Sequence, residues 1–426
     1  MFHRLLFIDL CFLSLIVAPA FSNEDFAERT QKMFGENWGK EEGLELGENP
    51  ALADYLRYGV QHNKGIVHIY HHWTIGVQAA RVEKYLEDPE LSVSQNSEER
   101  DYELMQKVPW FGKRGAKRDF ALRESEEKWF ETVSKKLALE RDIKKSYFDY
   151  AFLKKQLDIA EDTLKLLKQM EPVAQRKIQG GENQNDLLRL QVEIGKMENE
   201  ALSLQKGRQS MSAHLNAFLS RDFDSLLPWP MDFRVSECVL DVSHLKQLIR
   251  ERNPELLTIH QHIAKARDQM RLADLERWPD FEFGVMRMQM RDPMNEDDTQ
   301  FKVGVTLPIW AVKNEARRMQ GEFSLKANQL EIADMENMLF ADLETLLYQV
   351  DDASRQIGLY EKTLIPRAEQ AVQIVEAAYR SGNATLLEVI DSQRTLLDFG
   401  KSLWEARKNH EQSLADLEFL CGGDVR

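Results

Sequence analysis

The feature that most constrains this chain of 426 residues is a plan that occurs twice: two short alternating segments followed by a very long charged helical pattern. The long patterns cover about 111–179 and about 311–380. At about 1.5 Å per residue, each pattern predicts a rod on the order of 100 Å. The helices of ordinary globular domains are much shorter. The sequence therefore predicts a mainly α-helical protein built from long rods.

The two halves also begin alike, which indicates an internal duplication. Asn49-Pro50-Ala51-Leu52 matches Asn253-Pro254-Glu255-Leu256. Each stretch places Asn at a helix cap and Pro at the first helical position. Both rods then end at a glycine break, and apolar residues recur every seven positions after it, which indicates coiled-coil packing against a neighbouring helix. The breaks are at Gly180-Gly181 and Gly382, and the returning helices cover about 185–220 and 385–420.

Strand signals form one hairpin in each half, at about 89–95 with 102–108 and at about 280–290 with 299–307. Apolar and polar residues alternate along all four segments, which is typical of strands with two different faces. One face is apolar and the other is small or polar. The apolar face has Leu91, Val93, Tyr102, Leu104, Val108, Phe281, Phe283, Val285, Phe301, Val303, Val305 and Leu307.

The order of the elements predicts how the chain is divided. Arg4 precedes the largely apolar stretch 5–17 and small residues suited to cleavage, so the N-terminus is typical of a secretory signal. Prolines inside the rods, Pro172 and Pro366, should bend their helices or mark discontinuities. The predicted parts are a signal peptide (1–22), an N-terminal extension (23–48), the first repeat (49–221), a connector (222–252) and the second repeat (253–422).

Composition excludes some classes of function. With 71 acidic against 56 basic residues the net charge is −15, which argues against binding nucleic acid, because neutralising phosphates requires clustered Lys and Arg. The residues contain no catalytic constellation, so neither an enzyme nor a cofactor is expected. After the signal, no stretch approaches the ~20 apolar residues of a spanning helix.

Contact with a membrane would therefore involve the strands or the protein surface. Strands cross lipid only in a closed barrel, and four strands are too few to close a barrel with a usable interior. Several identical chains would have to share one barrel. The alternative is a soluble periplasmic coiled-coil scaffold or adaptor without a pore, which explains the rods but not the two-faced hairpins.

Two stretches carry a family resemblance: VPWFGKR after the second strand, and YRSGNATLLEVIDSQRTLL near the C-terminus. With the duplicated plan, they resemble the outer-membrane efflux family typified by TolC, especially its heavy-metal and cation efflux branch. The resemblance implies a homotrimer with a shared twelve-stranded barrel in outer-membrane lipid and an α-helical barrel in the periplasm. It also implies a passive duct that docks to a periplasmic adaptor and an inner-membrane pump and exports metal cations or small toxic molecules.

The resemblance assigns roles to charged residues near the second glycine break. Glu388 and Asp391 match positions where acids of three chains gather at the closed periplasmic tip, and Asp186 aligns with Glu388 in the first half. Such a ring would attract cations. The alternative is that these acids are solvated flanks of a coiled-coil seam. Arg189 or Arg380 could link to the acids and hold the tip closed.

The resemblance also implies two contact regions. At the helix turns, Gly180, Gly181 and Gly382 allow the left-handed geometry that reverses the chain, and the turns would contact the adaptor. The candidates beside them are Tyr379, Asn383 and Leu386. Where strands become helices, aromatic and basic side chains suit lipid headgroups. The residues of this membrane-interface junction are Pro109, Trp110, Lys113, Arg114, Pro308 and Trp310.

Two clusters could ligate metal, and two cysteines could pair. Imidazoles bind zinc or copper and thioethers favour soft Cu(I), but no cysteine or carboxylate joins the histidines at a convincing spacing, and a packed helix and a barrel lining are the favoured interpretations of the two clusters. The clusters are His68, His71 and His72, and Met286, Met288 and Met290, the latter facing the lumen. Cys238 and Cys421 could form a disulfide in an oxidising compartment, or remain two separate buried thiols.

Overall fold

The computed structural model describes residues 23–35, 46–47, 50–96, 99–179, 184–230, 233–236, 240–290 and 296–425. The predicted signal peptide 1–22 lies outside the described residues, as do Asn49, Gly180, Gly181 and Cys238. The chain forms two compact units. One consists of Met1–Gly39, Thr74–Ser125 and Asp268–Arg318, and the other of Lys40–Trp73, Glu126–Arg267 and Met319–Arg426.

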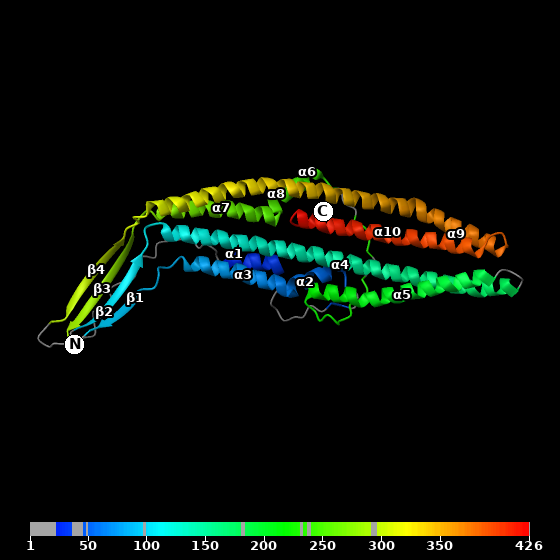
Figure 1. The fold of residues 1–426 in the computed structure, drawn as a ribbon, viewed down its shortest axis with the longest axis horizontal. Helices are drawn as coiled ribbons and strands as arrows, with labels where there is room; N and C mark the ends of the chain where they lie inside the picture. Colours follow the sequence, from blue (N-terminus) through cyan, green and yellow to red (C-terminus); the bar gives the residue numbers. More distant parts are fainter. Residues whose placement is uncertain are drawn as a thin grey trace. The chain divides into compact units, whose positions relative to one another are not determined.

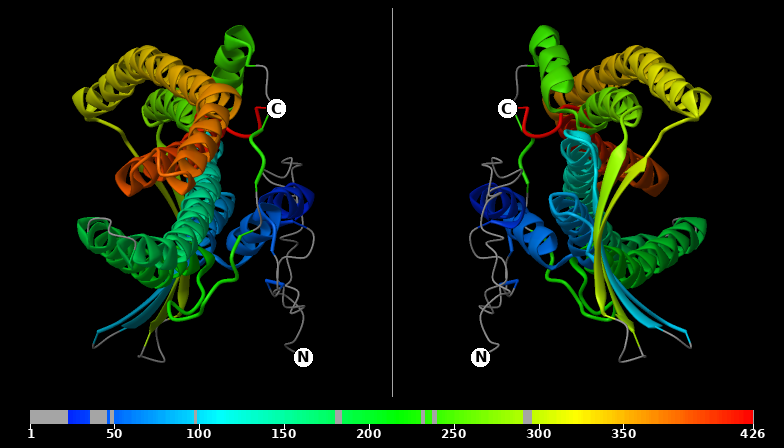
Figure 2. Two further views of the ribbon diagram at one scale, coloured as in Figure 1. Left: turned by 90° about the vertical axis from the view of Figure 1, so that its right-hand side faces the viewer. Right: turned by 90° about the vertical axis from the view of Figure 1, so that its left-hand side faces the viewer.

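The first unit contains one antiparallel sheet with the strand order β1-β2-β3-β4. Figure 1 labels the strands, and Figure 2 shows them side by side in one sheet. The middle pair, β2 with β3, joins the hairpin of the first half to that of the second. The prediction of a small four-stranded β part is confirmed. The strands are β1 (Glu90–Gln95), β2 (Glu99–Val108), β3 (Asp280–Met290) and β4 (Asp298–Thr306).

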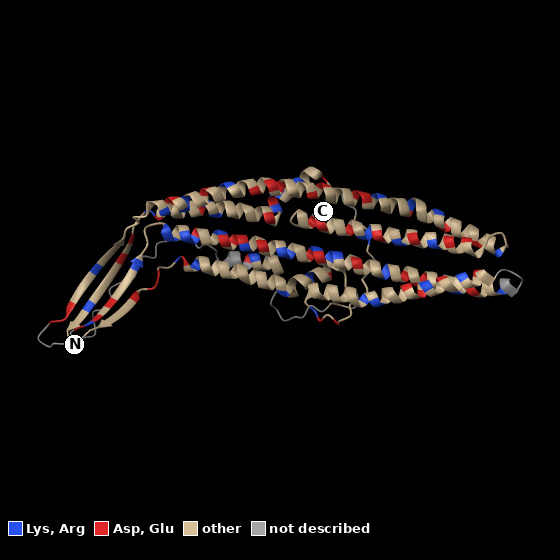
Figure 3. Cartoon of the chain, in the orientation of Figure 1, with Lys and Arg blue, Asp and Glu red and all other residues tan. Residues whose placement is uncertain are grey.

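Helices account for most of the remaining described chain (Figure 1). Lys and Arg alternate with Asp and Glu along the long helices, so these helices carry no long run of one sign (Figure 3). None of the described helices is long and apolar enough to cross a membrane. The helices are α1 (Asn23–Phe34), α2 (Leu52–His62), α3 (Lys64–Val82), α4 (Lys113–Gln179), α5 (Gln184–Leu219), α6 (Val242–Arg252), α7 (Pro254–Leu275), α8 (Ala311–Leu359), η1 (Tyr360–Leu364), α9 (Ile365–Arg380) and α10 (Leu386–Leu420).

The two prolines inside the rods behave differently. Helix α4 continues through Pro172 without a change of helix type, so no discontinuity lies there, and a bend at Pro172 stays a prediction. Before Pro366 the hydrogen bonding widens to the π-helical turn η1, in which the Ile365 N–H donates to the Tyr360 carbonyl. A proline ring clashes with the carbonyl four residues earlier and offers no N–H, and a wider turn relieves both problems. The discontinuity predicted at Pro366 is confirmed.

Apolar clusters hold the second unit together. The larger one joins α6 and α7 to α8 and to the end of α10, and full burial of each Leu or Ile side chain stabilises by roughly 1.5–3 kcal/mol. A second cluster joins α4, α5, α9 and α10 near the helix turns. The larger cluster contains Leu245, Leu248, Ile249, Leu256, Leu339, Leu343, Val350, Leu414, Leu417, Leu420 and Cys421. The second contains Leu167, Ala174, Leu190, Ile194, Tyr379, Leu386, Val389 and Ile390.

The duplication is visible in two asparagines that make the same three hydrogen bonds. Asn63 donates from Nδ2 to the Phe218 carbonyl at 2.7 Å and accepts from the amides two and three residues later. Asn253 donates to the Leu420 carbonyl at 2.9 Å and accepts from the equivalent amides. Each asparagine therefore caps a helix and ties it to the end of a return helix. The structural equivalent of Asn253 is thus Asn63, so the sequence alignment with Asn49 is wrong.

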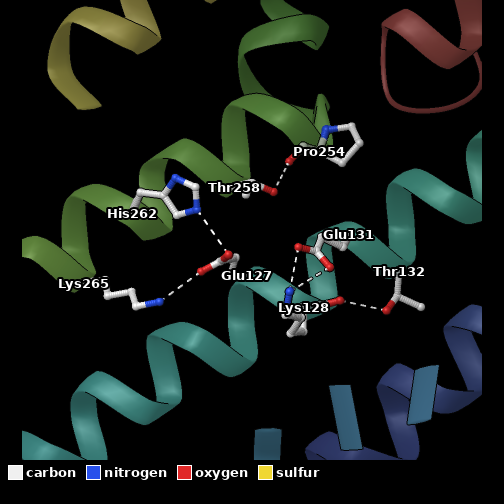
Figure 4. Close-up of polar contacts among 8 residues, drawn as sticks. All are labelled: Glu127, Lys128, Glu131, Thr132, Pro254, Thr258, His262 and Lys265. Carbon is white, nitrogen blue, oxygen red and sulfur yellow. Dashed lines mark hydrogen bonds and ion pairs between the residues drawn. The ribbon is translucent and has the colours of Figure 1, made fainter. Parts of the chain in front are cut away.

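Glu127 connects α4 to α7 within the second unit (Figure 4). Its two carboxylate oxygens lie 3.4 Å from His262 Nε2 and 3.4 Å from Lys265 Nζ. Both partners are on the same face of α7, one turn apart, as Figure 4 shows. The Glu127 side chain is only 18% exposed, so water screens this contact less than it screens a surface ion pair.

A buried acid anchors the connector to α10. Both oxygens of Glu411 accept hydrogen bonds from Ser236, from its amide at 2.7 Å and from its hydroxyl at 3.1 Å, and His410 Nδ1 lies 3.2 Å from one of them. Burial raises the pKa of Glu411, but the hydrogen bonds from His410 and Ser236 outweigh burial and the resulting pKa lies below its ordinary value. The connector is therefore fixed by a charged group.

Candidate functional site

One face of the sheet is apolar and exposed in the single chain. The strand register places Leu91, Leu104, Val285 and Phe301 directly opposite one another in one row. Their exposures are 66%, 48%, 41% and 82%. Parallel rows contain Val93 with Tyr102 and Phe283 with Val303, so the predicted apolar face is confirmed. An apolar patch of this extent marks an interaction surface.

The apolar face is bounded along the strands. The face begins at the row in which Phe281 on β3 lies opposite Val108 on β2. It ends at the row in which Arg287 on β3 lies opposite Tyr102 on β2. Beyond that row the same face carries Gln95, Arg100 and Gln289. Six residues at ~3.4 Å each give a band of roughly 20 Å. Strands of membrane barrels are tilted and present an apolar band about 25 Å tall to lipid, so the length of this face is of the same order but shorter.

The opposite face is polar. Lys302 on β4 reaches across β3 to Glu103 on β2, where the two form an ion pair at 2.7 Å. Gly284 lies on β3 opposite both Met105 and Lys302. A Cβ there would overlap the Met105 sulfur, so glycine is what makes room for these side chains.

The junction between strands and helices is built around Asp280. One of its oxygens accepts hydrogen bonds from the Trp110 amide at 2.8 Å and from Lys113 Nζ at 2.7 Å. Lys113 Nζ also donates to the Trp278 carbonyl at 2.8 Å, and the Trp110 and Trp278 rings stack with centroids 5.0 Å apart. Lys113 is only 6% exposed, so its amine holds the two hairpins together. Lys113 therefore has a structural role at the junction, and its contact with headgroups stays a prediction.

The rest of the predicted junction is more accessible. Trp310 is 72% exposed, while Pro109, Trp110 and Pro308 are partly buried. Arg114 is also partly buried and donates to the Lys84 carbonyl, so it too is engaged within the chain. The most exposed aromatic side chain here was not among the predicted residues: Phe111, at 84%. Its position beside Trp110 in VPWFGKR was the available signal.

The turn between α9 and α10 has the predicted glycine geometry. Gly382 has φ +80°, the left-handed conformation that ends a helix. The Asn383 amide donates to the Ala378 carbonyl at 2.8 Å and Asn383 is exposed. Tyr379 and Leu386 are only 5% and 1% exposed, because both pack in the cluster beneath the turn. Both side chains therefore have a structural role within the chain, and their contact with an adaptor stays a prediction.

The acids near the turns occupy the first turns of the return helices. Glu388 closes a capping box: its carboxylate accepts from the Thr385 amide at 2.7 Å, and its own amide donates to Thr385 Oγ1 at 3.3 Å. The signal for this role in the sequence is Thr385-Leu-Leu-Glu388, the capping-box pattern, which was not among the predicted features. Asp391 is exposed one turn later, and Asp186 is a partly buried acid in the first turn of α5. Acids stabilise helix N-termini, so part of this charge is structural.

The predicted gating arginines do not pair with these acids in the described part of the chain. Arg380 lies 3.9 Å from Glu376 on its own helix, with its side chain 80% exposed, and Arg189 is exposed. The ion pairs between α10 and α5 are different ones. Arg394 lies 3.4 Å from Glu193, and Lys401 lies 2.5 Å from Glu200 seven residues further along.

The histidine cluster forms ring contacts. His68, His71 and His72 are exposed on α3, and the rings of His68 and His72 meet edge to face at 4.7 Å. Among the described residues no group of three or more His, Cys, Asp or Glu is arranged to hold a metal ion.

Cys421 is buried in the larger apolar cluster, 1% exposed, and burial raises the pKa of its thiol to about 12. Its predicted partner Cys238 lies outside the described residues, so the disulfide stays a prediction.

A two-faced sheet joined to long helices is the fold of outer-membrane channel chains. The Neisseria gonorrhoeae MtrE outer membrane channel, solved in its open state, has the same fold with a TM-score of 0.74 and 14% identity over 92% of this chain and 95% of that one.

Sequence comparison leads to the same class. Residues 245–423 match the family model "Outer membrane efflux protein". The pyoverdine export outer membrane protein OpmQ of Pseudomonas putida is 23% identical over 67% of this chain and 62% of its own length. Outer membrane protein TolC of Vibrio cholerae is 25% identical over 31% of each chain. Over these residues the chain is similar to outer membrane efflux proteins, and it aligns with less than two thirds of the length of these two relatives.

Proposed function

We propose that this chain is one protomer of an outer-membrane channel through which an export system passes cargo from the periplasm to the exterior. The observation that carries the proposal is the two-faced sheet: a row of 41% to 82% exposed apolar side chains on one side and an ion-paired polar face on the other. Apolar side chains in contact with lipid and polar side chains in contact with water give the sheet a favourable environment on both faces.

The sheet also supports an assembly of several copies. Strands β1 and β4 are the ends of the strand order, so each has one edge without a partner strand in the described chain. Unpaired edges are not tolerated in lipid, and joining β4 of one copy to β1 of the next would remove them. Three copies would give the twelve-stranded barrel of the family resemblance, with long helices in the periplasm. The soluble scaffold leaves the exposed apolar band unexplained.

The proposed partners come from the similarity to outer membrane efflux proteins. Outer membrane efflux proteins work with periplasmic adaptors and inner-membrane pumps, and the adaptor of this channel would contact the helix turns. Gly382 and Asn383 at the α9–α10 turn are the accessible candidates, with Gly180 and Gly181 their counterparts outside the described residues. Metal cations or small toxic molecules remain the proposed cargo, in keeping with the heavy-metal and cation efflux branch.

The acids at the turns are the proposed charge filter. Glu388 and Asp391 are exposed and close together on α10, and Asp186 occupies the corresponding first turn of α5. In a trimer, three copies would concentrate negative charge at one level of the channel and favour cations. Arg189 and Arg380 stay candidates for links between copies, since neither is held by these acids within one chain.

The channel proposal is tested by fractionation and conductance. We expect the full-length protein to need detergent for extraction, to cross-link as a trimer, and to form ion-conducting pores in a planar bilayer. Recovery in the soluble periplasmic fraction without detergent, together with no conductance, would refute it and favour the scaffold.

The charge filter needs variants that keep the fold of the tip. Glu388→Ala would remove the cap as well as the charge, whereas Glu388→Gln can still accept the Thr385 hydrogen bond. We therefore expect Glu388→Gln with Asp391→Asn to lower the cation preference of the pore while leaving the fold intact. Glu405→Gln is the matched control, an exposed acid further along the same helix. Equal cation preference in the wild type and the double variant would exclude the filter.

A further inference from the structure

Three methionines on β3 lie on the polar face of the sheet, where apolar side chains are not needed for packing against lipid. The register places Met286 opposite Glu103, Met288 opposite Asp101 and Asp298, and Met290 opposite Glu99. The three methionines are partly buried, whereas the residues between them on β3 are exposed. Each of the three thioether side chains on β3 therefore stands opposite a carboxylate side chain on a neighbouring strand.

A fourth thioether joins them from β2. Met105 stands opposite Gly284, the residue two positions before Met286 on the same face. A Cβ at Gly284 would overlap the Met105 sulfur, so this sulfur lies directly over the β3 backbone. Same-face neighbours along a strand are ~7 Å apart and diagonal neighbours ~7–8 Å, distances that two long methionine side chains can close.

Asp101 provides an independent sign of a missing ligand. One of its carboxylate oxygens accepts a hydrogen bond from Ser94 Oγ at 3.1 Å. The other, Oδ1, is buried and has no hydrogen-bond partner among the described residues. A buried, unpaired carboxylate oxygen is destabilising, and a cation would satisfy it. Asp101 stands directly opposite Met288, so the unpaired oxygen belongs to the row of Met288, and Met286 lies in the next row on the same face.

We propose that the thioethers of Met286 and Met288, with the carboxylate of Asp101, bind a soft monovalent cation of the Cu(I) class, and that Met105 and Met290 flank this site on either side along the same face. Thioethers select such ions over Ca²⁺ and Mg²⁺, which prefer oxygen ligands, and over Zn²⁺, whose sulfur ligands are thiolates. Thioethers carry no charge, so the carboxylate supplies the neutralising one. The site involves β2 and β3 of one chain and needs neither the trimer nor the pore.

The test uses Ag(I), which has the same ligand preference and does not change oxidation state under the assay. The purified full-length protein in detergent is titrated with silver nitrate in chloride-free buffer, and binding is followed by calorimetry and by the NMR shifts of ¹³C-labelled methionine methyl groups. We expect Met286→Leu with Met288→Leu to weaken Ag(I) binding at least tenfold and Asp101→Asn to weaken it several-fold. Leucine keeps the volume, so circular dichroism should show an unchanged sheet.

Met319→Leu with Met338→Leu is the matched control, because both methionines are exposed on α8, at 50% and 60%. This control should bind Ag(I) like the wild type. Equal binding by wild type and Met286→Leu/Met288→Leu, or equal loss in the control, would overturn the proposal. Conductance of the wild type separates the two proposals: pores without Ag(I) binding would refute the cation site alone, and Ag(I) binding without pores would refute the channel alone.

Discussion

Replacing Lys113 by alanine should destabilise the sheet unit, because the amine of Lys113 holds the two hairpins together. The change removes two hydrogen bonds, to the Asp280 carboxylate at 2.7 Å and to the Trp278 carbonyl at 2.8 Å. Hydrogen bonds that involve a charged group contribute ~1.5–3 kcal/mol each, but losses at one side chain are not additive. The Asp280 side chain is 40% exposed and regains water, so we expect a total cost of about 2–3 kcal/mol.

The assay is the half-life of the detergent-solubilised fold at a fixed elevated temperature, followed by tryptophan fluorescence, because large membrane assemblies unfold irreversibly. If these bonds break before the transition state, 2–3 kcal/mol shortens the half-life by about 30- to 150-fold. Lys113→Met keeps a side chain of similar length without the amine and should lose most of the same stability.

Lys117→Ala is the matched control, an exposed lysine one turn further along α4. It should change stability by no more than about 0.5 kcal/mol, as surface substitutions usually do. Equal half-lives for Lys113→Ala and Lys117→Ala would show that the buried amine does not hold the hairpins, and the account of the junction would fail.

Three further predictions concern the helical unit. Asn253→Asp keeps the helix cap but turns a carboxylate oxygen toward the Leu420 carbonyl. Asn253→Ser also keeps the cap and loses only the hydrogen bond to Leu420, about 1 kcal/mol, so thermal melting should show a larger loss for Asn253→Asp than for Asn253→Ser. The pKa of Glu411 is lower in the folded than in the unfolded protein, so its contribution to stability is present above the unfolded pKa and is lost as the pH falls through the folded pKa. Glu411→Gln should therefore make the free energy of unfolding depend less on pH in this acidic range, which denaturation at a series of pH values would measure. In a Cys238→Ser background, the Cys421 thiol should resist a maleimide at pH 8 until the protein is unfolded, since a pKa of about 12 leaves about one thiol in 10⁴ ionised; rapid labelling of the native protein would contradict this.

The sequence predicted the elements of the fold well because each had a strong local period. Alternation along Phe281-Glu282-Phe283-Gly284-Val285 determines both the strand and its two faces, and the register confirms that the apolar members of neighbouring strands form common rows. The ends of the strands were less certain: β2 begins at Glu99, before the alternation becomes apolar. Consecutive polar residues at a strand end do not alternate with apolar ones, so the length of β2 predicted from the sequence was too short.

The contacts of individual side chains could not be predicted in the same way. A lysine after a strand is equally suited to a headgroup or to an aspartate, and only tertiary pairing places Asp280 beside Lys113. Tyr379 stands next to a turn in the sequence, but helix geometry directs it into the cluster beneath the turn. The twin asparagines were missed because Asn63 lacks the following proline that made Asn253 conspicuous.

The two halves share a fold but differ in charge at their helix turns, and this difference bears on any filter there. Asp186 and Glu388 both occupy the third position of a return helix, where an acid is favourable whatever the function. A functional role is therefore better indicated by an acid in the next turn of the helix, where the charge does not stabilise the helix N-terminus. There the halves diverge: Arg189 in the first half stands where the second half has Asp391. Selective attraction of cations would thus depend chiefly on Asp391, while Glu388 adds charge that the helix cap already requires.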